Sequence, residues 1–531
     1  MTTFIIIGVN NKMMKIPFGI TLIIILLALP FTSALDQNGF YQQSIHSEND
    51  ENTLPTIQED ISLPPPKLPS ILLEDVIARR GSVRDFKRQE ISLENISSIL
   101  WAAYGNVSGD KSVESIDGRH AIKIYVLMEK NAYFYNASNH SLLFFRRGRY
   151  RWLGDYDTAS IKLGLVWDTS VCKNENIAAA EIGMIGQNVY FMANALGLGT
   201  VTTAQKVNQL RLLRLPRGEQ PMIIMPIGIP VNDYDLTYSS YTSSLPFPET
   251  NTLSFVDALN EKQTWPYLSG SLTEREKSQI LWAAYGYSYL YDNLGDTRHR
   301  TLPSSMGTYP LEIYYANEDA FYQYQPMDHS IKPIINMDLR PNISDASYPW
   351  MQNAETIIIA LNYSKDNYSW AWFYEAGAIW HNILLESAAL GLYANVIVNF
   401  DLEKLQSTIN ISDVEPIMII QVGDKQGFDN DLPKITINSP KEKTLYLFGR
   451  EMTRSPMIII VGPMDAQILV NDTSFKIAEC FVDGEFIGES YTESFNMRFP
   501  AKFFKQCQFR IVARDYFGNE TSTSFDFFKV L

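Results

Sequence analysis

The chain contains two long stretches of similar sequence, and this duplication limits its fold more than any other feature. Residues 99–105, Ile-Leu-Trp-Ala-Ala-Tyr-Gly, recur as residues 280–286. Glu181-Ile182-Gly183 recurs as Glu375-Ala376-Gly377, so the spacing grows from 181 to 194 residues, and the copies differ by insertions. A repeat of this length excludes short solenoid repeats. It predicts two whole domains of one fold, packed about a pseudo-twofold axis as an intramolecular pseudo-dimer.

Composition narrows the class of protein. The 531 residues are 46% hydrophobic, which is enough apolar material for several cores. A net charge of −15 without a long Lys/Arg cluster opposes binding to nucleic acid. Three cysteines exclude a disulfide scaffold or a cysteine-rich metal centre, and leave Cys480 with Cys507 as one possible bridge. The histidines show no zinc-motif spacing, so we predict no metal site.

The amino terminus has the pattern of an export signal. Lys12 and Lys15 precede an apolar run over 16–29, which ends in Pro30 and small residues up to Ala34. Residues 1–34 therefore predict a signal peptide, with an uncleaved membrane anchor as the alternative. The run is shorter than the roughly 20 residues that span a bilayer comfortably. We expect an extracytoplasmic protein, secreted or at the cell surface.

Four further segments follow the signal. Residues 35–70 are acidic and Pro-rich, which predicts a disordered linker. Residues 71–250 and 265–440 hold the two copies, each with mixed helices and strands, so we predict α+β domains. In the first copy, apolar spacing predicts a long buried helix over 178–196. His381 stands where that helix has Gln187, and we expect it in the core or at the interface.

The segment 454–531 has a different pattern. Short alternating strands flank Asp483-Gly484, a typical hairpin turn, which predicts an all-β sandwich. Residues 481–484 and 513–519 resemble parts of the immunoglobulin-like modules of exported proteins. A spacer that presents the rest of the chain is favoured over specific adhesion.

One loop of the first copy concentrates cations. Arg79, Arg80 and Arg84 surround Gly81 and Ser82 between two predicted helices. Guanidinium groups bind phosphate oxygens bidentately, and a hydroxyl adds a donor. A solvated basic loop is the alternative. The stretch that we align with it in the second copy, 270–277, lacks the cluster, but that copy contains a turn-forming Pro-Ser-Ser segment at 303–307.

Together these segments resemble the nitroreductase family of flavin enzymes, and more closely its SagB-type dehydrogenase branch. The matching segments are Arg80-x-Ser82-x-Arg84-Asp85-Phe86, residues 100–105, Gln187-Asn188, residues 195–200 and Pro303-Ser304-Ser305-x-Gly307. The resemblance implies FMN at a dimer interface, where one protomer supplies the arginine loop and its partner the Pro-Ser segment. Gly81 departs from the family pattern, because it stands where a second arginine would be.

The resemblance also implies where an FMN would bind. The two copies retain complementary parts, so we expect one composite site and a decayed pseudosymmetric site. The expected cofactor-binding residues are Arg80, Ser82, Arg84, Thr202, Thr203, Ala204, Pro303, Ser304, Ser305 and Gly307. No side chain need act as a nucleophile, because the flavin itself carries the hydride.

Three functions remain open from the sequence. The first is an exported FMN-dependent oxidoreductase of the nitroreductase fold, which acts on a small-molecule substrate or redox donor. The second is a degenerate, non-catalytic flavin- or ligand-binding surface protein. The third is a surface interaction protein in which the duplicated domains serve as architecture.

Overall fold

The computed structural model describes residues 60–530 except 108, 249, 251–252, 365–368, 428 and 503. The predicted signal segment 1–34 and the predicted linker up to residue 59 lie outside the described residues. Among the residues that the structure describes, no helix is both long and apolar enough to cross a membrane.

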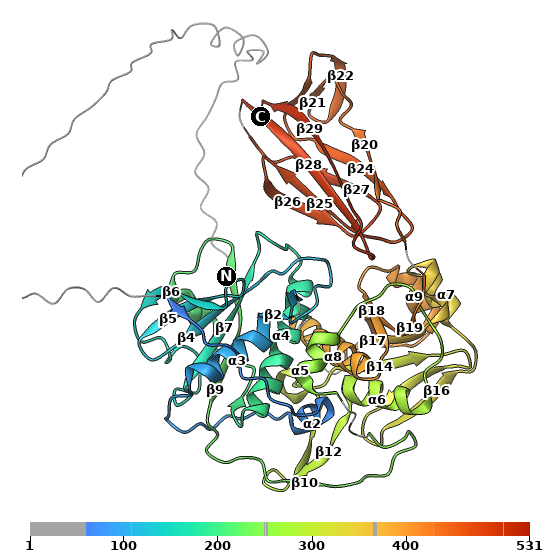
Figure 1. Ribbon diagram of the computed structural model, residues 1–531. Coiled ribbons are helices and arrows are strands. Elements are labelled where there is room, and N and C mark those ends of the chain that lie inside the picture. Colours follow the sequence, from blue (N-terminus) through green and yellow to red (C-terminus); the bar gives the residue numbers. More distant parts are fainter. Residues whose placement is uncertain are drawn as a thin grey trace, which may run out of the picture. The chain divides into compact units, whose positions relative to one another are not determined.

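The first lobe is an antiparallel seven-stranded sheet with helices, drawn in blue to green in Figure 1. Its helices are α2 (Leu73–Arg79), α3 (Leu93–Tyr104) and α4 (Glu175–Ala195), with the 3-10 turn η2 (Val207–Leu213). Its sheet runs β1 (Ile61–Ser62), β6 (Ser141–Arg147), β5 (Asn131–Asn136), β4 (Ile122–Leu127), β7 (Ile161–Asp168), β9 (Glu219–Gly228) and β8 (Gly199–Thr200). A small hairpin, β2 (Asn106–Val107) and β3 (Asp110–Lys111), follows α3.

The second lobe repeats this arrangement. Its helices are α5 (Phe255–Glu261), α6 (Glu274–Tyr285) and α8 (Ser369–Ala389), with additional α7 (Arg340–Asp345), α9 (Leu402–Ile409), η3 (Ser305–Gly307) and η4 (Pro349–Asn353). Its sheet runs β16 (Ser330–Ile335), β15 (Phe321–Gln325), β14 (Leu311–Ala316), β17 (Glu355–Asn362), β19 (Val414–Lys425) and β18 (Tyr393–Ile397), with β11 (Leu268–Ser269) also on β19. The hairpin after α6 is β12 (Tyr287–Asp292) with β13 (Thr297–Arg300), and β10 (Leu236–Tyr238) pairs with β12.

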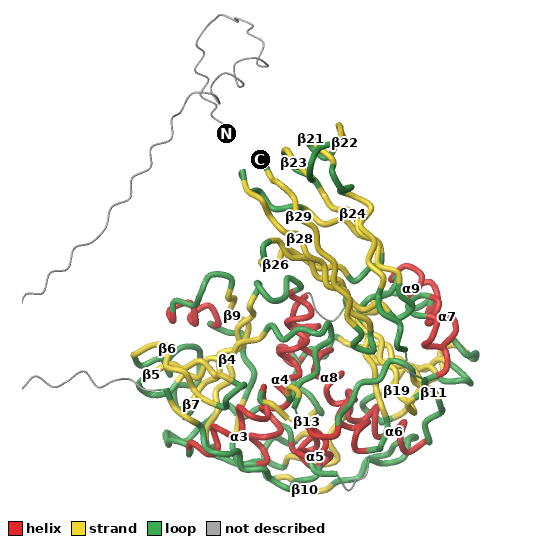
Figure 2. Tube along the Cα trace, turned by 45° about the horizontal axis from the view of Figure 1, so that its top comes forward, coloured by secondary structure: helices red, strands yellow, loops and turns green. Residues whose placement is uncertain are grey.

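The two lobes meet along the long helices α4 and α8, which lie side by side between the two sheets in Figure 2. Two equivalent glycines let the helix backbones touch. A Cβ atom on Gly183 would lie closer than 3.0 Å to the carbonyl oxygen of Tyr374, and one on Gly377 would meet that of Ala180. Because equivalent glycines of the two copies make equivalent contacts, the lobes form the expected pseudo-dimer.

Buried polar side chains also pair across this interface. The Gln187 amide donates to Asn382 Oδ1 at 2.8 Å, and His381 Nε2 lies 2.7 Å from Asn188 Oδ1. The prediction that His381 lies in the core or at the interface is therefore confirmed. Burial lowers the pKa of His381 to about 3, so the imidazole is neutral at physiological pH.

The C-terminal segment consists of two packed sheets. One is β20 (Lys434–Ser439), β24 (Asp465–Asn471) and β27 (Ser494–Arg498). The other is β22 (Arg450–Arg454), β21 (Thr444–Leu447), β23 (Ile458–Val461), β29 (Glu520–Lys529), β28 (Lys505–Asp515), β25 (Phe475–Val482) and β26 (Glu485–Ser490). Side chains of both sheets share one core, as in a sandwich. The likeness to immunoglobulin-like modules stays a prediction.

The structure changes three details of the sequence interpretation. Residues 61–62 of the expected linker pair with β6, and the Pro64 carbonyl accepts from Ser97 at 2.5 Å, so the end of that segment belongs to the first lobe. Strand β20 pairs with β24, so the sandwich begins before 454. The Cys480 and Cys507 thiols are free. Cys480 lies opposite Ile511 of β28, and Cys507 is four residues from Ile511, or about 13 Å along that strand, which is too far for a disulfide.

Candidate functional site

The arginine loop of the first lobe begins where α2 ends. Arg80 is the C-cap residue and only 5% exposed, and its Nε donates to the Arg300 carbonyl of the second lobe at 3.0 Å. The Val83 amide donates to the Thr200 carbonyl at 2.9 Å, which fixes the loop beside β8. Arg84 is exposed and donates to the Ser82 carbonyl at 3.3 Å. The loop therefore presents one buried and one exposed guanidinium at the lobe boundary.

The segment 202–204 follows β8 and lies beside this loop. Tyr190 of α4 connects the two, because its hydroxyl is 3.2 Å from Ser82 Oγ and accepts from the Thr202 amide at 2.8 Å. Thr203 pairs with Ile224 of β9 through its backbone, and the Ala204 carbonyl accepts from Val207. These contacts bring Ser82 and Thr202 onto one wall.

The Pro-Ser segment comes from the second lobe. Ser304 Oγ donates to Glu375 of α8 and accepts from the Tyr309 amide at 2.9 Å. The turn through Ser305 closes when the Gly307 amide, at a φ of +70°, donates to the Ser304 carbonyl at 3.2 Å. Pro303 is buried, while Ser304 and Ser305 are half-buried.

Helix α8 links this segment to the first lobe. Tyr374 Oη lies 2.9 Å from Thr202 Oγ1, and the next residue, Glu375, holds Ser304. Burial keeps the pKa of the Tyr374 phenol well above its usual value, so the hydroxyl stays protonated. Segments from both lobes therefore converge on one place through adjacent residues of one helix.

Two residues that make cation–π contacts near the arginine loop and the Pro-Ser segment, Arg300 and Tyr190, were not singled out from the sequence. Arg300 ends β13, is 8% exposed, and donates through Nη2 to the Tyr285 carbonyl at 2.8 Å. Its guanidinium lies over the rings of Tyr285, Tyr287 and Tyr309 at 4.4, 4.5 and 4.4 Å. The other is the ring of Tyr190, which lies 5.3 Å from the Arg80 guanidinium carbon. An arginine three residues before Pro303 was the sequence signal for Arg300.

Glu375 is the carboxyl group that contacts the Pro-Ser segment, through Ser304. It is 1% exposed, and burial raises its pKa to about 8, although hydrogen bonding from Ser304 and the charge of Arg300 act in the opposite direction. The side chain is therefore mainly protonated at pH 7. It positions Ser304 without neutralising the neighbouring arginines.

Gly81 has a steric reason for its identity. A Cβ atom there would lie closer than 3.0 Å to the ring of Tyr234, which comes from the connection after β9. An arginine at position 81 would have to displace this ring. The departure from the family pattern is therefore compensated by an aromatic side chain that fills the same space.

The pseudosymmetric position identifies the true counterpart of the arginine loop. The Trp265 amide donates to the Ala394 carbonyl, as the Val83 amide donates to the Thr200 carbonyl. Lys262 and Arg80 each stand three residues before these donors, so Lys262 corresponds to Arg80. The expected counterpart, 270–277, is wrong, because those residues lie at β11 and the start of α6. Ser112 and Thr301 make the same bond to the glycine after α3 and α6, so Glu114 corresponds to Pro303.

The second position carries an internal ion pair. Lys262 Nζ lies 2.9 Å from Glu114 and donates to the Lys111 carbonyl at 3.2 Å, and both its neighbours come from the first lobe. Its side chain is 4% exposed. The cation that corresponds to Arg80 is therefore neutralised within the chain.

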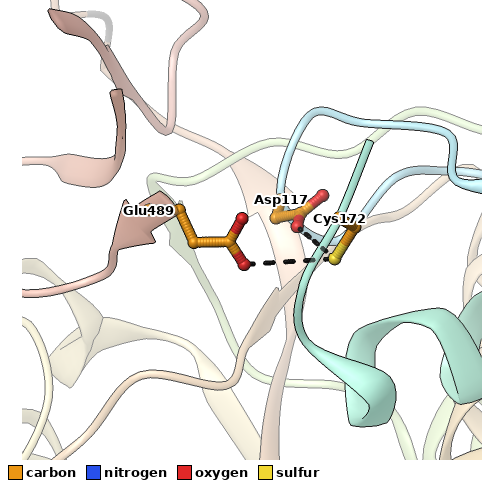
Figure 3. A group of neighbouring side chains, drawn as sticks. All are labelled: Asp117, Cys172 and Glu489. Atoms are coloured by element: carbon orange, nitrogen blue, oxygen red, sulfur yellow. Dashed lines mark hydrogen bonds between the residues drawn. The ribbon is translucent and has the colours of Figure 1, made fainter. Parts of the chain in front are cut away.

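A further polar cluster lies at the segment that follows Glu114. Asp117, Cys172 and Glu489 of β26 face one another in Figure 3. Arg119 pairs with both carboxylates, and Tyr491 donates to Asp117 at 2.9 Å. Burial raises the pKa of the Cys172 thiol to about 12, which makes it a poor nucleophile. An arginine already supplies the positive charge among these acids, so the cluster joins the sandwich to the first lobe.

Comparisons with known proteins agree with this architecture. Residues 77–229 and 266–424 each match the nitroreductase family, and together they make up more than half of the chain. The candidate nitroreductase MJ1384 of Methanocaldococcus jannaschii is 31% identical over 186 residues, which are 31% of this chain and 93% of that protein.

A solved structure shows the same fold. That of a candidate nitroreductase from Anabaena variabilis covers 70% of this chain and 93% of its own, with 12% identity and a TM-score of 0.51. That of a candidate nitroreductase from Ralstonia eutropha covers 34% of this chain and 93% of its own, with 28% identity and a TM-score of 0.31. The duplicated part of this chain therefore belongs to the nitroreductase family, a family of flavin-dependent oxidoreductases.

Proposed function

We propose that the chain is an exported FMN-dependent oxidoreductase with a single flavin site, formed by the arginine loop of the first lobe and the Pro-Ser segment of the second. The export signal in residues 1–34 supports the location, with a membrane tether as the alternative if that segment is retained. The substrate would be a small molecule or redox donor that delivers or accepts hydride. The SagB-type branch stays a prediction.

One observation carries the proposal. Arg80 and Arg300 are both buried, and in the part of the chain that the structure describes neither pairs with a carboxylate within 4.0 Å. A guanidinium remains charged at any pH that a folded protein meets. An unpaired buried charge costs about 3–5 kcal/mol, so such a site favours an anionic ligand. The equivalent Lys262 has Glu114 as its partner and offers no such preference.

The residues present suit a flavin mononucleotide. Arg80 would bind the phosphate, with Arg84 at the exposed end of the loop and Ser82 as a hydroxyl donor. Ser304 and Ser305 supply hydroxyls from the second lobe, next to Pro303 and the Gly307 turn. Thr202, Thr203 and Ala204 would form the adjoining wall, where Thr202 is held by Tyr190 and Tyr374. A bound flavin supplies reversible hydride transfer.

Other side chains of the site hold protons and exclude water. Tyr190 and Tyr374 are buried phenols that fix Ser82 and Thr202. The protonated Glu375 accepts from Ser304 and adds no negative charge beside the arginines. The side chains that contact the Arg80 guanidinium are the Ser82 hydroxyl and the Tyr190 ring, which suits an anionic aromatic ligand.

Flavin content tests the proposal. Purified protein, loaded with FMN and freed of excess, should contain one flavin per chain by absorbance after denaturation. Arg80→Gln should weaken FMN binding about 10- to 100-fold, because a hydrogen bond to a charged group contributes about 1.5–3 kcal/mol. The matched control Lys262→Gln changes the pseudosymmetric cation and should leave the affinity unchanged.

The same preparation separates an enzyme from a passive binder. Dithionite should bleach the bound flavin, and an added quinone or other acceptor should restore its colour. Two flavins per chain, or equal effects of Arg80→Gln and Lys262→Gln, would contradict a single asymmetric site. Failure to bind FMN at any concentration would refute the cofactor assignment.

A further inference from the structure

Arg300 occupies an unusual environment for a structural arginine. Three tyrosine rings surround its guanidinium at 4.4–4.5 Å, and one backbone carbonyl accepts from Nη2. Its Nε atom is buried and has no hydrogen-bond partner among the described residues. Aromatic faces stabilise a cation without removing its charge. The site therefore holds Arg300 in place while leaving hydrogen-bonding capacity for another group.

The two buried arginines come from different lobes and meet through the backbone. Arg80 Nε donates to the carbonyl of Arg300 at 3.0 Å, which joins the loop after α2 to the end of β13. The Tyr309 hydroxyl lies within the field of both guanidinium charges. Like charges that share a buried site repel each other, because burial reduces the screening by solvent. An anion between or beside them would stabilise both.

The pseudosymmetric position provides an internal comparison. Lys111 corresponds to Arg300. Its Nζ atom lies 4.4 Å over the ring of Tyr104 and donates to the Tyr104 carbonyl at 3.2 Å, as Arg300 donates to the Tyr285 carbonyl. The Lys111 carbonyl accepts from Lys262, as the Arg300 carbonyl accepts from Arg80. There the chain supplies the anion itself, since Glu114 pairs with Lys262 at 2.9 Å. Pro303 stands at the position of Glu114, three residues after Arg300, whose carbonyl accepts from Arg80. The same paired-cation arrangement thus lacks its carboxylate on one side only.

We propose that Arg300 of the second lobe binds the phosphate of the cofactor together with Arg80, and so supplies across the lobe boundary the second positive charge that Gly81 cannot supply. This rests on the proposed FMN site. It assigns a ligand-binding role to a residue that precedes the Pro-Ser segment, and it makes the site depend on both lobes for charge as well as for shape.

The test compares FMN with riboflavin, which has the same ring system without the phosphate. Equilibrium dissociation constants would be measured by flavin fluorescence at fixed ionic strength for the wild type, Arg300→Gln, Arg300→Lys and the control Lys111→Gln. Arg300→Gln should weaken FMN about 10- to 100-fold and riboflavin less than about threefold, because only the phosphate carries the charge. Arg300→Lys should retain part of the preference for FMN, and Lys111→Gln should behave as wild type.

Two results would overturn the inference while leaving the proposed function intact. One is an unchanged FMN affinity in Arg300→Gln. The other is an equal loss of FMN and riboflavin, which would assign Arg300 a purely structural role. If Arg300→Gln does not fold, Arg300→Lys decides: a reduced ratio of FMN to riboflavin affinity supports the inference, and an unchanged ratio refutes it.

A parallel measurement separates failure of the inference from failure of the cofactor assignment. Inorganic phosphate, compared with chloride at equal ionic strength, should raise the melting temperature of the wild type more than that of Arg300→Gln. A protein that binds no FMN but shows this phosphate effect would retain the anion site and refute the proposed function. A protein that shows neither would refute both.

Discussion

The helix crossing at Gly183 gives the sharpest test of the pseudo-dimer. Gly183→Ala places a methyl group against the backbone of α8, closer than 3.0 Å to the Tyr374 carbonyl oxygen and 2.9 Å from the Ala378 nitrogen. Backbone cannot rotate away as a side chain can, so α4 and α8 must separate. Overpacking a core costs about 1–3 kcal/mol, and a contact with backbone lies at or above the upper end.

The net effect follows from two opposing contributions. Alanine is favoured over glycine within a helix by about 1 kcal/mol. Subtracting this from a steric cost near or above 3 kcal/mol leaves a loss of about 2–4 kcal/mol. For lobes of this size we expect a fall in melting temperature of about 5–10 °C, measured by differential scanning calorimetry or circular dichroism.

Gly186→Ala is the matched control, because it lies one turn further along the same helix. The added methyl group would meet the Tyr374 hydroxyl at 2.7 Å, at the far end of a side chain that can move. The gain in helix propensity and the loss of the hydrogen bond to Thr202 should nearly cancel, at about 1 kcal/mol each. If Gly183→Ala proves as stable as Gly186→Ala, the close approach of the two helix backbones is refuted.

Two further predictions concern single groups. Burial raises the pKa of Glu375 to about 8, so between about pH 4.3 and 8 the folded state retains a proton that the unfolded state has lost. The contribution of this group to the free energy of unfolding is complete below about pH 4.3 and is lost as the pH rises to 8. Glu375→Gln should flatten that part of the profile of unfolding free energy by about one proton; an unaltered slope would contradict the assignment. Tyr491→Phe removes hydroxyl contacts to Asp117 and Arg119 at 2.9 and 3.0 Å, and should weaken the attachment of the sandwich to the first lobe by about 1–3 kcal/mol. Limited proteolysis should then be faster. The control Tyr291→Phe, on an exposed hairpin, should behave as wild type.

The sequence predicted the parts of the fold that depend on local pattern. The long helix expected over 178–196 is α4, Glu175–Ala195, and the duplicated landmarks lie at equivalent places in both lobes. Hydrophobic spacing and capping residues act within a few turns, so they can be interpreted without tertiary contacts. The same holds for the family resemblance, since its residues are contiguous motifs.

Features that arise from distant contacts could not be predicted. Tyr234 lies against Gly81 although 153 residues separate them, and the cage around Arg300 depends on the pairing of β12 with β13. The counterpart of Arg80 was misaligned because Lys262 shares with it neither residue type nor flanking motif. The backbone bonds of Val83 and Trp265, and the bonds of Arg80 and Lys262 to equivalent carbonyls, show the equivalence.

Fusion of the two lobes explains how one position can keep free cations while the other neutralises them. In a twofold homodimer every residue occurs at both sites, so a glutamate at the position of Pro303 would pair with the arginine loop on both sides. In the fused chain Pro303 and Glu114 occupy equivalent positions independently, each three residues after the residue whose carbonyl accepts from Arg80 or Lys262. A single change from proline to glutamate therefore decides whether the buried cation pairs within the chain or favours an external anion. Pro303→Glu should consequently make the first position resemble the second and reduce FMN binding, even though Arg80 and Arg300 are both retained.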